Sequence, residues 1–135
     1  MKKQVTGKMP HLYIEYTDNI QAEADMPGLL RKMNETLLSH RDVIPAGGLR
    51  SRAMMLTDYV VADGSSDDAF VHVTLKLGKG RTEEDKHKIC DDLFKTVKDH
   101  FRLLYDKRYL ALSLELYEFQ QPTWKKNNIH TRYTT

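Results

Sequence analysis

The sequence lacks the features that mark secreted or membrane-embedded proteins. Its 135 residues include one cysteine, Cys90, which cannot form a disulfide within the chain, so nothing indicates an oxidising compartment. No apolar run is long enough to span a bilayer, and the basic residues 1–8 have no apolar stretch behind them, unlike a signal peptide. We therefore expect a cytoplasmic protein with no membrane partner.

An excess of charge of one sign is also missing. The chain has 21 Lys and Arg against 19 Asp and Glu, and the basic residues are scattered rather than gathered in a stripe, which argues against nucleic acid as a partner. With 40% apolar and 30% charged residues, the composition is typical of a soluble globular protein. The length fits one domain.

Several common catalytic motifs are missing as well. The six histidines include no His-x-x-x-His pair, and no cysteine cluster could hold zinc. The loop at 78–81 lacks the glycine spacing of a phosphate-binding loop. His72 lies within a predicted strand and is better interpreted as a packed or interface residue than as a ligand, and Cys90 as a small apolar filler of a helix. These residues predict no metal site.

Apolar periodicity predicts two strand–helix–strand units, over about 12–61 and 69–118. Residues 12–16, 49–61, 69–77 and 110–117 alternate like strands, whereas 26–37 and 83–104 carry helical stripes. Asp25 is a plausible cap of the first helix, although its start could lie near Ile20, and Thr82 caps the second, which ends near Tyr105 and Asp106.

Two such units predict an α+β fold. Its four-stranded sheet holds parallel strands within each unit and carries both helices on one face. The leucine-rich alternation suggests that the other face is partly apolar, so we expect an oligomer. The tail at 120–135, which contains Pro122, Trp124 and Tyr133, is too short to fold alone and is expected to pack on a neighbouring subunit.

The pair Met9-Pro10 stands directly before the first predicted strand. If translation starts at Met9, removal of the methionine leaves Pro10 with a free secondary amine. An α-amino group titrates near ~7.7–8.0, and burial beside cations lowers that pKa, which would make the amine a general base at neutral pH. On this dipeptide alone, Pro10 is better interpreted as the opening residue of an edge strand.

Longer motifs favour the interpretation of Pro10 as a base over that of a strand opener, because they resemble the 5-carboxymethyl-2-hydroxymuconate isomerase family of the tautomerase superfamily. The resemblance covers most of the chain. The motifs that carry it are 10–19 (PHLYIEYTDN), 24–29 (ADMPGL), 48–52 (GLRSR), 62–64 (ADG), 69–81 (AFVHVTLKLGKGR) and 126–130 (KNNIH).

The resemblance implies a tautomerase-like doubled β-α-β fold assembled as a homotrimer, with Pro10 as the catalytic base. It also implies an isomerase of aromatic catabolism (homoprotocatechuate breakdown) that shifts a proton in a small unsaturated di- or tricarboxylate, from the dienol to the oxo form, without metal or cofactor. Arg50 and Arg81 fall where the family binds substrate, and guanidinium groups suit carboxylates. The further candidates for substrate binding are Arg52, His11 and Phe70.

The residues before Pro10 depart from this pattern. While residues 1–9 are attached, the Pro10 nitrogen is a tertiary amide without a basic lone pair, so we interpret them as a leader or an added extension before a single domain at 10–135. The loop at 39–42 also looks longer than in the family, which affects the match of Arg50 to the family's first substrate-binding arginine. Two alternatives stay open: a related tautomerase acting on another enol or keto acid, and a non-catalytic trimeric binding module whose Pro10 is blocked.

Overall fold

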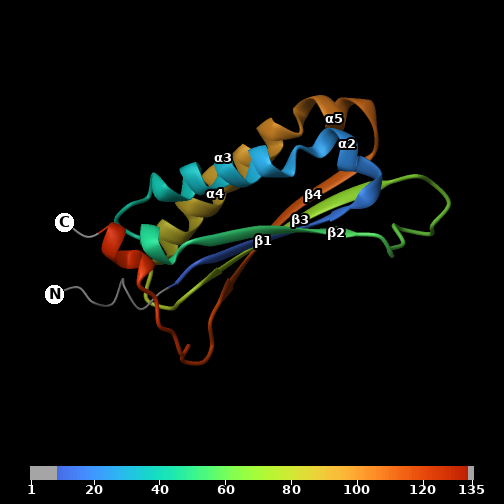
Figure 1. Cartoon of the computed structure of the whole chain (residues 1–135). Helices are drawn as coiled ribbons and strands as arrows, with labels where there is room; N and C mark the ends of the chain where they lie inside the picture. Colours follow the sequence, from blue (N-terminus) through green and yellow to red (C-terminus); the bar gives the residue numbers. More distant parts are fainter. Residues whose placement is uncertain (1–8, 134–135) are drawn as a thin grey trace.

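A computed structural model describes residues 9–133 of the chain, so residues 1–8 of the predicted leader at 1–9 lie outside the described residues. Figure 1 shows a layer of strands with a layer of helices on one side of it. No helix within 9–133 has the length and apolar character needed to cross a bilayer. In chain order, the elements are β1 (His11–Thr17), η1 (Asp18–Ile20), α2 (Gln21–Ala24), α3 (Met26–Leu38), η2 (Ala46–Gly48), β2 (Arg50–Leu56), β3 (Ala69–Leu77), α4 (Glu83–His100), α5 (Arg102–Lys107), β4 (Leu110–Glu118) and η3 (Ile129–Arg132).

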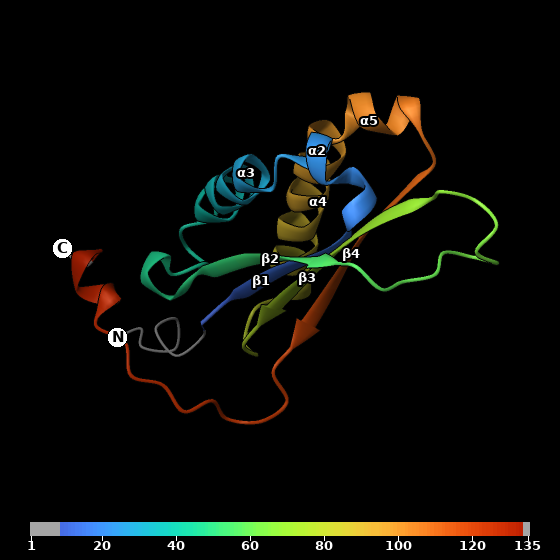
Figure 2. The same cartoon turned by 45° about the vertical axis from the view of Figure 1, so that its right-hand side comes forward.

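The sheet has the topology expected of two joined strand–helix–strand units. Its order is β2-β1-β3-β4. β1 pairs with β2 in parallel and β3 pairs with β4 in parallel, whereas β1 and β3 meet antiparallel at the centre. The α+β prediction with a four-stranded sheet and its helices on one face is therefore confirmed, as Figure 2 shows from a second direction.

The core lies between the sheet and α3 and α4. Alternate residues of β1 and β3, such as Leu12, Ile14 and Val73, are fully buried against the helical stripes. The leucines of β4 also pack against this core, since Leu112 pairs with the buried Val71. The β4 leucines therefore do not contribute to the open face, contrary to the expectation that they make it partly apolar. That face instead carries charged, polar and aromatic side chains: His11, Tyr13, Glu15, Arg52, Phe70, His72, Thr74, Lys76, Ser113, Glu115 and Tyr117.

The predicted caps are confirmed at both long helices. The Asp25 carboxylate accepts a hydrogen bond from the Gly28 N–H (3.1 Å), and the Thr82 hydroxyl accepts one from the Asp85 N–H (3.0 Å). Two separate short helical elements, η1 and α2, precede α3, so α3 itself begins at Met26 after the Asp25 cap and not near Ile20. The second helix is shorter than predicted, because the chain bends at Phe101 before α5.

Two boundaries differ from the sequence-based expectation. β2 ends at Leu56 rather than at 61, because its parallel partner β1 ends at Thr17, the residue paired with Leu56. The C-terminal tail does not depend on another subunit for all its contacts: η3 packs on η2 of the same chain, and the Asn127 amide donates a hydrogen bond to the Gly47 carbonyl (2.9 Å). Trp124, in the extended part of the tail, is 89% exposed.

Candidate active site

Pro10 lies at the start of β1, next to Met9 and to η2. Its carbonyl accepts a hydrogen bond from the Arg50 N–H (3.2 Å), which fixes Pro10 at the beginning of the parallel ladder with β2. Both Pro10 and Met9 are buried, and Met9 is only 3% exposed. The nitrogen of Pro10 therefore lies in a site shielded from water, but its peptide bond to Met9 deprives it of basicity.

Three cations surround His11, the residue after Pro10, at this end of the open face. The two ladders place Arg50 and Lys76 opposite His11, and the Arg52 guanidinium lies 3.0 Å from the His11 Nδ1. Burial lowers the pKa of His11, and the positive charges of Arg52, Arg50 and Lys76 lower it further. The imidazole is therefore neutral near pH 7, so its Nδ1 can accept the hydrogen bond from Arg52.

Arg50 and Arg52 both belong to this cluster, although the sequence favoured Arg50 over Arg52. Arg52 also stacks over the Tyr13 ring, with its guanidinium carbon 4.8 Å from the ring centroid. A planar guanidinium held over an aromatic ring is well placed to bind a carboxylate. Sequence reasoning missed Lys76, because only the antiparallel pairing of β1 with β3 brings Lys76 next to His11.

Aromatic side chains border the same cluster. The Phe119 ring meets His11 edge-on at 6.2 Å, and the Lys76 ammonium lies 5.6 Å from the Phe119 centroid and 5.3 Å from that of Tyr117. Cations next to aromatic surfaces suit a ligand that combines carboxylates with a flat conjugated body.

Arg81 is held by backbone carbonyls in the loop between β3 and α4. Its Nε and one terminal nitrogen donate to the Val43 carbonyl (3.0 and 2.6 Å), and the other terminal nitrogen donates to the Gly78 carbonyl (3.0 Å). Burial lowers the pKa of Arg81, although not enough to discharge a guanidinium. Two of its five N–H groups remain for a ligand, so Arg81 can brace the loop and bind an anion at once.

Phe70 lies at the opposite end of the sheet from Pro10. It stands beyond Val71, which pairs with Tyr16 near the end of β1, and its N–H donates to the Thr17 hydroxyl (3.2 Å). The structure of one chain therefore brings together Pro10, His11 and the arginines of β2, but not Phe70. Only a second copy of the chain could place Phe70 near Pro10.

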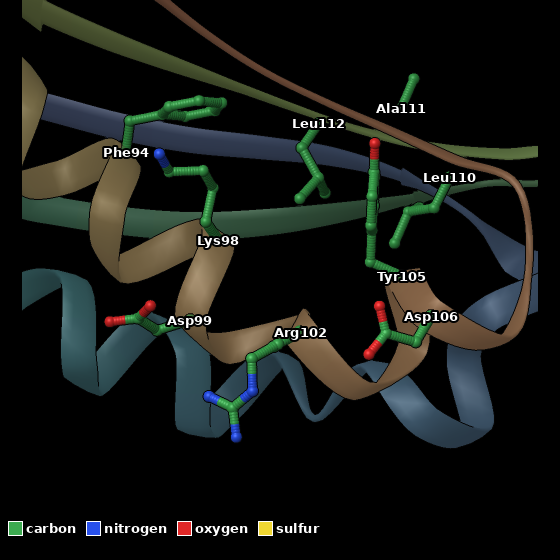
Figure 3. A pocket seen from close by; sticks show the side chains of 9 residues that line it. All are labelled: Phe94, Lys98, Asp99, Arg102, Tyr105, Asp106, Leu110, Ala111 and Leu112. Atoms are coloured by element: carbon green, nitrogen blue, oxygen red, sulfur yellow. The ribbon is translucent and has the colours of Figure 1, made fainter.

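A cavity of about 620 Å³ lies away from Pro10, between α4, α5 and the beginning of β4. Figure 3 shows Tyr105 reaching toward the leucines of β4, whereas the Lys98 ammonium lies over the Phe94 ring, 5.3 Å from its centroid. Because Leu112 pairs with Val71, this cavity is at the Phe70 end of the sheet. It lacks the cation cluster, so we do not assign the chemistry to it. Within 9–133, no group of three or more His, Cys, Asp or Glu side chains could hold a metal ion.

Comparison with known proteins identifies relatives over nearly the whole chain. The model of the 5-carboxymethyl-2-hydroxymuconate isomerase family matches residues 10–133. The chain is 43% identical over 127 residues to a protein of Escherichia coli named 5-carboxymethyl-2-hydroxymuconate Delta-isomerase, with 93% of this chain and 99% of the relative covered.

Solved structures agree with this result. A 5-carboxymethyl-2-hydroxymuconate isomerase from Deinococcus radiodurans R1 is 49% identical, with a TM-score of 0.92 over 96% of this chain and 97% of that one. A 5-carboxymethyl-2-hydroxymuconate delta-isomerase structure is 25% identical, with a TM-score of 0.87 over 96% and 95% of the two chains.

Proposed function

Because the chain belongs to the 5-carboxymethyl-2-hydroxymuconate isomerase family, we propose that it converts 5-carboxymethyl-2-hydroxymuconate from the dienol to the oxo form, in the breakdown of homoprotocatechuate. The substrate is a flat, conjugated tricarboxylate. The observation that carries the proposal is the cluster of Arg50, Arg52 and Lys76 beside Pro10, because three cations, two of which lie over aromatic rings, match such a molecule.

Pro10 acts as the base after residues 1–9 have been removed. Its neutral secondary amine takes the proton of the enol hydroxyl, whose oxygen becomes a carbonyl as the conjugated double bonds shift. The resulting ammonium returns a proton to the carbon at the far end of the conjugated system, so no proton is gained or lost overall. Burial and the nearby cations favour the neutral amine at neutral pH.

The cations have a second role in this reaction. Negative charge spreads over the dienolate as the hydroxyl proton leaves, and fixed positive charge nearby lowers the barrier. Arg50 and Arg52 lie on the same strand as the backbone group that holds Pro10, so they are positioned without a mobile loop. Arg81 contributes its two remaining N–H groups, and its bonds to two backbone carbonyls join two loops at the end of the sheet where β1 begins.

We further propose that the active protein is a homotrimer whose copies share their sites. Pro10 and Phe70 lie at opposite ends of one sheet, so a site that contains both needs two chains. Met54 and Met55 on β2 are 44% and 46% exposed, and association would cover them. Sedimentation at micromolar protein should give three times the mass of the chain, and a stable monomer would contradict this assembly.

A non-catalytic trimeric binding module is the second candidate. It applies only to the chain that keeps residues 1–9, because Pro10 is buried and acylated in that form. A related tautomerase with another enol acid as substrate would use the same base. The binding module differs from the proposed enzyme because it has no turnover. The related tautomerase differs in the number of substrate carboxylates that its site prefers.

The test uses the protein that begins at Pro10, with 5-carboxymethyl-2-hydroxymuconate and with 2-hydroxymuconate, which lacks the carboxymethyl branch. We expect a higher kcat/KM for the tricarboxylate, and Arg50→Gln should lower that value about 10- to 100-fold through loss of a charged hydrogen bond. Arg31→Gln, on the exposed surface of α3, is the matched control. A preference for 2-hydroxymuconate would support the related tautomerase, whereas binding without turnover would support the binding module.

A further inference from the structure

The C-terminal η3 brings His130, a residue that sequence reasoning did not single out as a site residue, to the beginning of β1. The Asn127 side chain links the tail to η2 by donating to the Gly47 carbonyl (2.9 Å), and its own oxygen accepts from the Ile129 N–H (2.7 Å). Figure 1 shows η3 beside η2 at the end of the sheet where β1 starts. His130 is therefore held in place by its own chain.

Gly47 permits this close approach. A Cβ on Gly47 would lie 2.6 Å from the His130 Nδ1 and 2.7 Å from the His130 Cα, which is too close for any side chain. A Cβ on Gly48 would lie 3.4 Å from the His130 Cε1 and 3.5 Å from the Met9 Cα. The imidazole and Met9 therefore border the same small space in front of Gly48.

Met9 occupies the place that the reacting end of a substrate must take. A general base needs the proton that it abstracts within about 3 Å of its own atom. The Pro10 nitrogen is bonded to Met9, so that region is filled by the buried Met9 in the uncleaved chain. Once Met9 is absent, a substrate in position to react with Pro10 meets Gly48 and His130.

His130 has free hydrogen-bonding capacity at this point. The residue is only partly exposed, and neither ring nitrogen is hydrogen-bonded to another residue within the described part of the chain. A neutral imidazole offers one donor and one acceptor, so the ring can bind a ligand without breaking a hydrogen bond to another described residue.

We propose that His130 is a substrate-binding residue. Its imidazole N–H donates to an anionic oxygen at the reacting end of the substrate, which is the enol oxygen or the carboxylate next to it. The inference rests on the proposed function for the identity of the substrate, and on the contacts of η3 for the position of the imidazole. The C-terminal tail then takes part in substrate recognition as well as in folding.

Turnover by the form that begins at Pro10 gives the first test. His130→Ala should lower kcat/KM about 10- to 100-fold, the effect of losing a hydrogen bond to a charged group, and His130→Gln should recover part of the loss because it keeps a donor. Gly47→Ala should cause a similar loss although it touches no substrate, since its Cβ displaces η3. His87→Ala, on the exposed side of α4, is the control.

A second readout does not depend on turnover. The His130 imidazole signal is followed by NMR while muconate, an unsaturated dicarboxylate without a hydroxyl to deprotonate, is added to the form that begins at Pro10. We expect a saturable shift at His130 and none at His87. A shift without turnover of 5-carboxymethyl-2-hydroxymuconate would uphold the role of His130 and overturn the proposed function. Turnover that His130→Ala leaves unchanged, or the lack of any His130 shift, would overturn the role of His130.

Discussion

Replacing Arg81 by alanine tests whether this arginine braces the fold as well as binding substrate. The guanidinium makes three hydrogen bonds, two to the Val43 carbonyl and one to the Gly78 carbonyl, and so joins the loop after α3 to the loop after β3. Arg81→Ala removes all three and leaves both carbonyls in need of partners.

The magnitude follows from those three bonds. A hydrogen bond to a charged group contributes ~1.5–3 kcal/mol when buried, and water reaches part of this site and can replace the lost partners. We therefore expect the free energy of unfolding to fall by about 2–3 kcal/mol, which corresponds to a decrease in Tm of roughly 10 °C for a domain of this size. Arg81→Lys keeps the charge but not the planar guanidinium with its several donors, so its free energy of unfolding should fall by about half as much.

Urea unfolding followed by circular dichroism measures this change, with Arg31→Ala on the exposed side of α3 as the control. A loss below about 0.5 kcal/mol, the level of an ordinary surface substitution, would refute the bracing role of Arg81. In that case the contacts with Val43 and Gly78 would add nothing to stability, and any loss of activity in the variant would report on substrate alone.

Three further predictions concern local features. Burial and the charge of Arg52 hold the pKa of His11 below ~6.5 in the folded protein. The contribution of His11 to stability is therefore complete above about pH 6.5 and is lost as the pH falls through the folded-state pKa. An NMR titration midpoint of His11 that does not rise in Arg52→Gln would contradict the role of that charge. Thr82→Ala removes the hydrogen bond from the Asp85 N–H and should cost about 1 kcal/mol in urea unfolding, and a loss under ~0.3 kcal/mol would argue against the cap. Burial raises the pKa of the Cys90 thiol, so iodoacetamide at pH 7.5 should modify it at least ~10-fold more slowly than a free cysteine peptide, and an equal rate would show an accessible thiolate.

The fold was largely predictable because its signals are local. Alternation in β1 and β3, the helical stripes and the caps at Asp25 and Thr82 each depend on neighbouring residues, and each is confirmed. The end of β2 was not predictable in this way, since it depends on where β1 stops pairing. The orientation of the β4 leucines likewise depends on which face the helices cover.

The candidate site was predictable only in part. Met9-Pro10 and the arginines of β2 stand in recognisable motifs, whereas Lys76 reaches His11 through the antiparallel pairing of distant segments. His130 is separated from Pro10 by almost the whole chain and approaches it through a close backbone contact at Gly47. No pattern within a short window of sequence carries such information. The homotrimer and the role of Phe70 stay predictions, because they depend on contacts between chains.

The most direct test of the central claim compares two forms of the protein, residues 1–135 and the form that begins at Pro10, in an ultraviolet assay of the conversion of 5-carboxymethyl-2-hydroxymuconate to its oxo form. The amine of Pro10 is free in the second form only, so we predict turnover by that form and none by the longer one. Equal activity of the two forms would contradict the assignment of Pro10 as the base, because an acylated proline nitrogen cannot accept the proton.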